Sequence, residues 1–294
     1  MKRTPAPLAL ALVAAAVAAS AQDFAGLGGL EDQLSGIRAA TQAQKAIPQE
    51  PTPHAMGGGK EGAFRADALE PDAVPQVGPY QVRGIDVSHF QGAIDWGKVS
   101  ASGVSFAYIK ATEGGDYVDD QFAANWSGAQ SAGVTRGAYH FYNFCKTGSE
   151  QADRFIATVP ADAGALPATI DLEESADCAT MPGKAAFRKD LADFVAKVQA
   201  AYGRLPVLYV NYSIYNLYFK GENDSYKIWI ADTGDASPAM PGGAPWTVWQ
   251  YGWHGAVAGV SGEVDLDVFN GTPEMLASLA DGDSGVLVAS LTQR

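Results

Sequence analysis

The sequence predicts an α/β protein built as an irregular (β/α) barrel. From Tyr80 onward, short β-rich runs alternate with helical stretches, which is typical of a parallel sheet whose strands are joined by helices. The alternation stops after Tyr212, because residues 232–246 are rich in Gly and Pro and residues 254–262 are too few for a crossover helix. We therefore expect a barrel whose last strands are joined by loops.

The expected elements follow one another without long gaps. Eight runs have strand composition, at residues 81–88, 104–112, 136–144, 168–173, 206–212, 227–231, 247–253 and 264–269. Helical spacing of apolar residues marks residues 94–102, 119–132, 149–159 and 184–202, and a final helix is expected at 273–279. The helix at 184–202 is the clearest, since it carries apolar side chains on one face and charged ones opposite.

The two ends of the chain lie outside the expected barrel. Lys2 and Arg3 precede an apolar run at 8–19, and the small residues ASA at 19–21 form a signal-peptidase pattern. The run is too short to span a bilayer, so we expect cleavage after Ala21 and no membrane attachment afterwards. The predicted organisation is a signal peptide at 1–21, a flexible low-complexity tether at 22–79, the barrel at 80–280 and a C-terminal tail at 281–294. The protein is thus expected to be secreted or periplasmic.

The charge, histidine and cysteine content indicate which partners, metal sites and disulfides to expect. A formal net charge of −13 repels phosphate backbones, which makes nucleic acid an improbable partner. The four histidines are scattered, so no metal site is expected. Cys145 and Cys178 directly follow the third and fourth predicted strands, and in an exported protein such a pair predicts a disulfide.

Two carboxylates close the apolar run at 166–170. On a strand, Asp171 and Glu173 point to one face roughly 6.5–7 Å apart, which leaves room for a bond to be broken between them. Strand ends carry the active site of a barrel, and Asp86 and Asp265 also lie at such ends. A pair of carboxylates flanking the bond is the usual arrangement in glycoside hydrolysis, so Asp171 and Glu173 are candidate catalytic residues and Asp86 and Asp265 are expected to share their site.

Aromatic and amide side chains accompany the acids on the same strands. Aromatic faces stack on sugar rings, so a glycan cleft is expected where they gather. The predicted substrate-binding residues are Tyr139, Phe141, Tyr209, Asn211, Trp229, Trp249 and Tyr251. His140, by contrast, is expected to satisfy a hydrogen bond within the core.

Six motifs, in order over residues 80–272, resemble those of glycoside hydrolase family 25, the lysozyme-like muramidases. They are RGIDVSHFQG at 83–92, FAYIKATEG at 106–114, GAYHFY at 137–142, DLE at 171–173, WQY at 249–251 and VDLD at 264–267. The resemblance implies a flattened barrel of five β/α units followed by three strands. It also implies cleavage of the β-1,4 bond between N-acetylmuramic acid and N-acetylglucosamine in peptidoglycan, without a cofactor.

The resemblance also assigns roles. Glu173 resembles the proton donor, Asp171 its partner carboxylate, and Asp86 and Asp265 the flanking acids. Two other functions stay open from the sequence: a non-catalytic module that binds peptidoglycan or chitin, and a hydrolase of another N-acetylated glycan. Retaining, inverting and substrate-assisted mechanisms all remain compatible with two acids at i and i+2. The protein is expected to act as a monomer.

Overall fold

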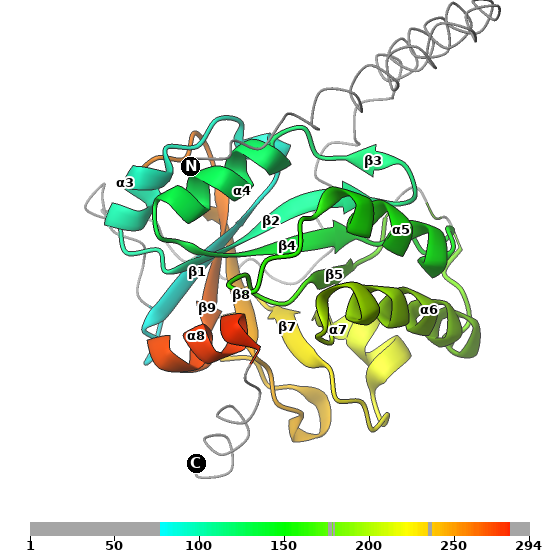
Figure 1. The fold of residues 1–294 in the computed structure, drawn as a ribbon. Helices are drawn as coiled ribbons and strands as arrows, with labels where there is room; N and C mark the ends of the chain where they lie inside the picture. The colour runs from blue at the N-terminus through cyan, green and yellow to red at the C-terminus, as the bar shows by residue number, and fades with distance from the viewer. Residues whose placement is uncertain (1–76, 176–177, 179, 235–236, 283–294) are drawn as a thin grey trace, which may run out of the picture. The chain divides into compact units, whose positions relative to one another are not determined.

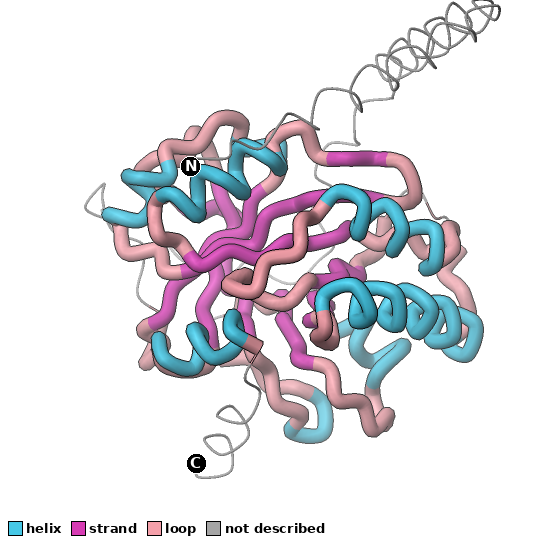
Figure 2. Tube along the Cα trace, viewed as in Figure 1, coloured by secondary structure: helices cyan, strands magenta, loops and turns pink. Residues whose placement is uncertain are grey.

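Eight strands close into a barrel whose outer face carries the helices (Figures 1 and 2). The computed structural model describes residues 77–175, 178, 180–234 and 237–282. The predicted signal peptide, most of the predicted tether and the tail from residue 283 lie outside the described residues. Among the described residues, no helix is long and apolar enough to cross a membrane.

The strands are β1 (Val82–Val87), β2 (Phe106–Glu113), β3 (Tyr117–Val118), β4 (Thr135–Phe141), β5 (Thr169–Leu172), β6 (Val207–Val210), β7 (Lys227–Ala231), β8 (Val248–Gly255) and β9 (Val264–Phe269). The helices are α3 (Trp96–Ala101), α4 (Phe122–Ser131), α5 (Gly148–Thr158), α6 (Lys184–Tyr202), α7 (Tyr212–Ile214) and α8 (Pro273–Asp281). Shorter helical turns are η1 (His89–Gln91), η2 (Tyr215–Phe219), which is a π-helix, and η3 (Pro241–Gly243).

The barrel strands follow the order β1, β9, β8, β7, β6, β5, β4, β2, and β1 pairs with β2 to close the ring. All pairs from β1 through β8 around this ring are parallel, whereas β9 is antiparallel to both of its neighbours. The short β3 forms a hairpin with the end of β2. The reversal of β9 matters for the site, because its first residues lie where the other strands end.

This architecture confirms the predicted barrel of five β/α units followed by three strands. The helices α3, α4, α5 and α6 follow the first four parallel barrel strands, and α7 with η2 completes the fifth unit. β7 and β8 are joined by a loop that contains η3, and β8 connects to β9 without a helix. The sequence pattern did not predict α7, η2 or β3, each of which is too short to show a clear periodicity.

Two layers of apolar side chains hold the barrel together. The outer layer packs strand residues such as Ile170 and Leu172 of β5 against helix residues such as Phe187 and Phe194 of α6. The inner layer fills the barrel with side chains of the opposite parity, among them Phe106 and Trp229. Thr169 and Asp171, which alternate with Ile170 and Leu172, therefore point inward.

Helix α8 closes one end of the barrel. β9 runs against the other strands, so α8 follows it at the end where those strands begin. Met275, Leu276 and Leu279 of α8 belong to the inner apolar layer. The opposite end, where the parallel strands finish, is the mouth at which polar side chains gather.

Candidate active site

The four predicted catalytic carboxyls meet at this mouth. Asp86 lies near the end of β1, Asp171 lies in β5, and Glu173 is the first residue after β5. Asp265 is the second residue of the reversed strand β9, and its Cα is the direct partner of Asp86. Residues from distant parts of the chain thus share one site, as the strand-end argument predicts.

Asp171 and Glu173, at the end of β5, are buried enough for the pair to hold a proton near neutral pH. Burial, followed by the negative charge of Asp86, raises the pKa of Glu173 from 4.5 to about 7. Burial and then Glu173 raise the pKa of Asp171 well above its usual value. Two neighbouring carboxyls in such a place do not both ionise readily, so the pair retains a proton that it can donate.

A lysine that the sequence reading did not single out balances this pair. Nζ of Lys110 is 2.7 Å from Oε2 of Glu113, and both side chains are largely buried. Its positive charge lowers the pKa of both Asp171 and Glu173, against the effect of burial. The available signal was its place in the apolar strand 106–111, where a lysine is costly unless paired.

Gln250 of β8 orients the acid on β1. Its Nε2 donates to Oδ2 of Asp86 at 2.8 Å. Its Oε1 accepts from the hydroxyl of Tyr209 at 2.8 Å and from Nε1 of Trp253 at 2.9 Å. Tyr209 of β6 and Trp253 of β8 therefore hold the amide that fixes Asp86. The sequence indicated Gln250 only as part of the WQY motif.

Asp267 is a fifth acid beneath the mouth. Its side chain is completely buried, and its Oδ1 accepts from Nε1 of Trp229 at 2.9 Å. Burial is the main cause that raises the pKa of Asp267 well above its usual value, followed by the charges of Asp86 and Asp265. It lies two residues after Asp265, so strand alternation could have placed it on the same face.

Three of the predicted substrate-binding residues line the inner side of this mouth. Tyr139 and Tyr209 are buried beside the acids, and burial and the neighbouring carboxylates raise the pKa of both phenols. Phe141 is half-buried, and the centroid of its ring lies 5.0 Å from Nζ of Lys110. These rings are placed where a sugar bound between the acids would lie.

The other four predicted substrate-binding residues have different places. Trp249 and Tyr251 pack in the outer apolar layer, where Trp249 also meets the ring of Tyr80 at 6.0 Å. Trp229 faces inward but is only 1% exposed and is stacked on Tyr108. Oδ1 of Asn211 accepts from the backbone N–H of Ile214, so this residue caps α7. The rings of Trp249, Tyr251 and Trp229 are therefore buried away from the mouth in this structure.

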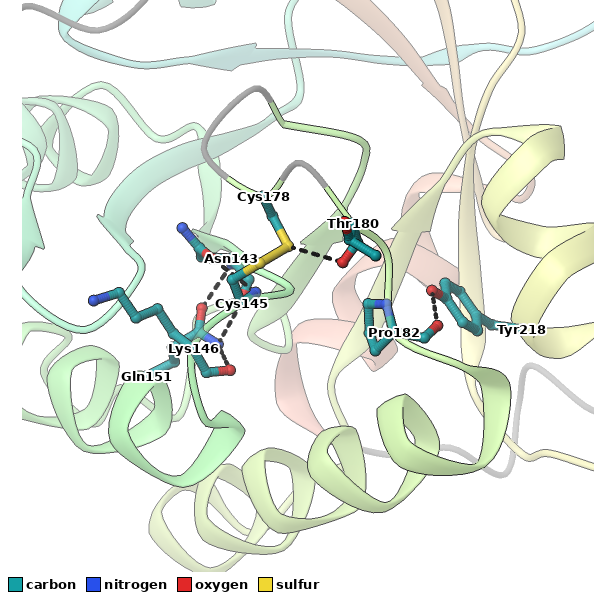
Figure 3. Close-up of a disulfide and its surroundings, with 8 residues drawn as sticks. All are labelled: Asn143, Cys145, Lys146, Gln151, Cys178, Thr180, Pro182 and Tyr218. Carbon is teal, nitrogen blue, oxygen red and sulfur yellow. Dashed lines mark hydrogen bonds between the residues drawn. A yellow bond between two sulfur atoms is a disulfide. The ribbon is translucent and has the colours of Figure 1, made fainter.

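The predicted disulfide is present between Cys145 and Cys178, whose Cα atoms are 5.4 Å apart (Figure 3). Cys145 lies in the loop after β4 and Cys178 in the segment after Glu173. The bridge therefore joins the two loops that leave the mouth beside the β5 acids. His140 also behaves as expected, with hydrogen bonds to Thr112 at 2.7 Å and Gln151 at 3.1 Å inside the core.

The site offers proton transfer and a group of carboxylates that can stabilise positive charge. Glu173 is half-buried at the mouth, whereas Asp171 is only 8% exposed and its Oδ1 is a buried oxygen that no described donor reaches. Among the described residues, no group of three His, Cys, Asp or Glu side chains is arranged to hold a metal ion. An acid that can release a proton beside acids that can ionise is suited to breaking an acetal bond.

Comparison with known proteins gives consistent matches over the barrel. The sequence pattern of "Glycosyl hydrolases family 25" matches residues 85–260. Lysozyme M1 of Streptomyces globisporus is 41% identical over 210 residues, which cover 68% of this chain and 71% of that protein. The N,O-diacetylmuramidase of Chalaropsis sp is 31% identical over 202 residues, which cover 63% of this chain and 96% of that protein.

Comparison of the structure with solved structures also finds a similar lysozyme. The crystal structure of the bacterial lysozyme from Streptomyces coelicolor is similar with a TM-score of 0.66 and 39% sequence identity, covering 70% of this chain and 100% of that one. The segment matched by the family pattern contains Asp86, Asp171 and Glu173, and Asp265 lies just beyond it. The matched region is therefore the one that carries the acids of the mouth.

Proposed function

The chain belongs to glycosyl hydrolases family 25, and from this premise we propose that it is a peptidoglycan muramidase in which Glu173 is the general acid. The bond cleaved is the β-1,4 linkage between N-acetylmuramic acid and N-acetylglucosamine. The observation that carries the assignment of Glu173 is its position directly after β5, half-buried beside Asp171, with a pKa raised to about 7.

Glu173 begins the reaction by giving its proton to the glycosidic oxygen. The bond from this oxygen to the anomeric carbon of N-acetylmuramic acid then breaks, and N-acetylglucosamine leaves with the proton. Positive charge develops on the muramic acid ring, where the carboxylates of Asp171 and Asp86 favour it. Lys110 holds Asp171 toward the ionised form, since its charge lowers the pKa of that carboxyl.

We infer that the acetamido group of the substrate is the nucleophile. Its carbonyl oxygen attacks the anomeric carbon, and Asp171, which keeps 8% of its surface exposed at the mouth, orients the amide by accepting its N–H. Glu173, now ionised, takes a proton from a water molecule as the water opens the intermediate. Two successive attacks at the same carbon retain the β configuration, and the acid returns to its starting state.

Digestion of purified peptidoglycan tests the assignment. The reducing-end sugar released by the enzyme is reduced with labelled borohydride and identified, and labelled muramitol is the expected product. Labelled glucosaminitol would mean that the other glycosidic bond is cleaved. Tight binding without new reducing ends would instead support a glycan-binding module, and equal release from chitin would point to a hydrolase of another N-acetylated glycan.

We also propose that the enzyme is exported and acts as a monomer on cell-wall glycan, without nucleic acid or membrane partners. The disulfide supports export, because such bonds persist in oxidising compartments. Intact-mass analysis of protein secreted from the expressing cell should show a chain that lacks residues 1–21. A mature chain that retains these residues would contradict the predicted cleavage after Ala21.

A further inference from the structure

The acid cluster at the mouth contains two carboxyls that the proposed reaction does not use, Asp265 and Asp267, and Asp267 is the deeper of the two. Asp267 lies on β9 with 0% of its surface exposed, so it does not reach the substrate. Its Cα is paired with Gly84 of β1, whereas that of Asp265 is paired with Asp86. Asp267 therefore lies one inward-facing position deeper in the barrel than Asp86.

Gln250 determines which member of the cluster accepts hydrogen bonds. An indole N–H can only donate, so the atom of Gln250 that Trp253 contacts at 2.9 Å is the amide oxygen. The other end of the amide is consequently the N–H₂ group, which donates to Oδ2 of Asp86 at 2.8 Å. Donors bind most strongly to an ionised carboxylate, so this arrangement favours negative charge on Asp86.

The surroundings of Asp267, unlike those of Asp86, favour the neutral form of its carboxyl. Its Oδ1 already accepts from Trp229. Its Oδ2 is buried, and no N–H or hydroxyl donor of the described residues reaches it. The groups that it faces are the carboxyls of Asp86 and Asp265. An anionic oxygen without a donor is costly in such a place, whereas a proton on Oδ2 allows it to donate to a neighbouring carboxylate.

We propose that Asp267 is a neutral carboxylic acid that donates a hydrogen bond to ionised Asp86, and that it is thereby a positioning residue for the charge that faces Glu173. The assignment rests on the proposed function, because its consequence is the protonation of the general acid. The hydrogen bond between the two residues raises the pKa of Asp267 and lowers that of Asp86, which is the direction that a neutral donor and an ionised acceptor require.

Several other titratable side chains surround the three carboxyls of Asp86, Asp265 and Asp267. They are Tyr108 on β2, Tyr139 on β4, Asp171 and Glu173 at the end of β5, Tyr209 on β6, Tyr251 on β8 and Asp265 on β9. Asp265 also shares a hydrogen bond with Asp86 that raises its own pKa and lowers that of Asp86. Among Asp86, Asp265 and Asp267, Asp86 is thus the one that accepts hydrogen bonds from both of the others and from Gln250, so the negative charge of the three lies on Asp86.

The substitution Asp267→Asn keeps a hydrogen-bond donor to Asp86 but removes the ability of residue 267 to become negatively charged. The amide oxygen can accept from Trp229 and the amide nitrogen can donate to Asp86, with no proton to lose. We expect kcat/KM within about threefold of the wild type and the alkaline pKa of the pH profile unchanged within about 0.3, since Asp86 stays ionised. Asp267→Ala removes the donor, so we expect kcat/KM to fall about 10- to 100-fold. Its alkaline pKa should also fall, because a less ionised Asp86 repels the charge of Glu173 less.

Val248→Ala is the matched control for the cavity left by the alanine. Val248 is buried on the inner face of β8, outside the acid cluster. If Asp267→Ala and Val248→Ala have the same pH profile, Asp267 only fills space and the proposal is wrong. A lower alkaline pKa in Asp267→Asn would also overturn it, because that result means that the substitution removed a negative charge.

Carbon NMR of protein with ¹³C-labelled aspartate carboxyls gives a direct reading. We expect one resonance with the shift of a neutral carboxylic acid at pH 7 that is lost in Asp267→Asn. If the resonance lost has the shift of a carboxylate, the proposal is refuted. This measurement needs no turnover, so it stays informative if the protein does not cleave peptidoglycan, and the two failures can be told apart.

Discussion

Replacing Glu173 by Gln should inactivate the protein and stabilise it at alkaline pH. The amide keeps the size of the side chain but has no proton to give to the leaving oxygen, so we expect kcat to fall about 10²–10⁴-fold. The same amide cannot ionise. It therefore removes the cost that the folded protein bears when a half-buried carboxyl becomes charged.

The size of the stabilisation follows from the environment of Glu173. Burial and then the charge on Asp86 raise its pKa from 4.5 to about 7. A raised pKa contributes stability that is complete below pH 4.5 and is lost as the pH rises through about 7. The shift corresponds to about 3 kcal/mol, which solvent at the partly exposed carboxyl reduces to about 1–2 kcal/mol. The variant should thus unfold about 2–8 °C above the wild type at pH 8 and close to it at pH 4.

Both effects can be measured on the same preparations. Release of reducing ends from peptidoglycan reports turnover, and circular dichroism reports thermal unfolding at pH 4, 6 and 8. Glu174→Gln is the matched control, because Glu174 is the next residue in the chain and is exposed. Near-normal turnover by folded Glu173→Gln would refute the general-acid assignment. Unfolding temperatures that follow the wild type at every pH would refute the raised pKa.

Three further substitutions test the surroundings of Glu173. Asp171→Asn should lower kcat severely, and NMR of the wild-type reaction should show the β-anomer as the first product, whereas an α-anomer would exclude retention. Lys110→Met removes a charge that lowers the pKa of Glu173, so the alkaline limb of the pH–activity profile should move to higher pH, and a shift to lower pH would contradict this role. Replacing Cys145 and Cys178 by Ser opens a bridge across 33 positions, so denaturant unfolding should show a loss of about 3–4 kcal/mol, and unchanged stability would mean that the bridge adds little.

The architecture could be predicted because each barrel strand leaves a local pattern in the sequence. Strands covered on both faces are short apolar runs, and amphipathic helices separate them until the chain reaches β7. The acids could be predicted for a similar reason, since Asp86, Asp171 and Glu173 all lie near the ends of such runs. Strand ends converge in a barrel whatever the intervening sequence, so a local pattern here determines a distant contact.

Depth within the barrel is not a local property. Trp229 faces inward as an active-site tryptophan would, yet its ring lies against Tyr108 and its N–H is bound by Asp267. Asn211 ends a strand in the same way as the acids, but its side chain caps the helix that begins at the next residue. Lys110 was overlooked because a lysine is usually solvated, and its role depends on carboxyls about 60 positions further along the chain.

The outward direction of Trp249 and Tyr251 could not be predicted from their own strand, because strand alternation gives two parities and does not say which one points inward. Pairing with β9 supplies the missing information. Asp265 faces the mouth, so Asp267 does as well, and Gln250 lies directly opposite Asp267 in the antiparallel ladder. Partners across a ladder share a face, which turns Gln250 inward and its neighbour Trp249 outward. The register of β8 against β9 therefore places the amide of Gln250 in the acid network and the ring of Trp249 outside it.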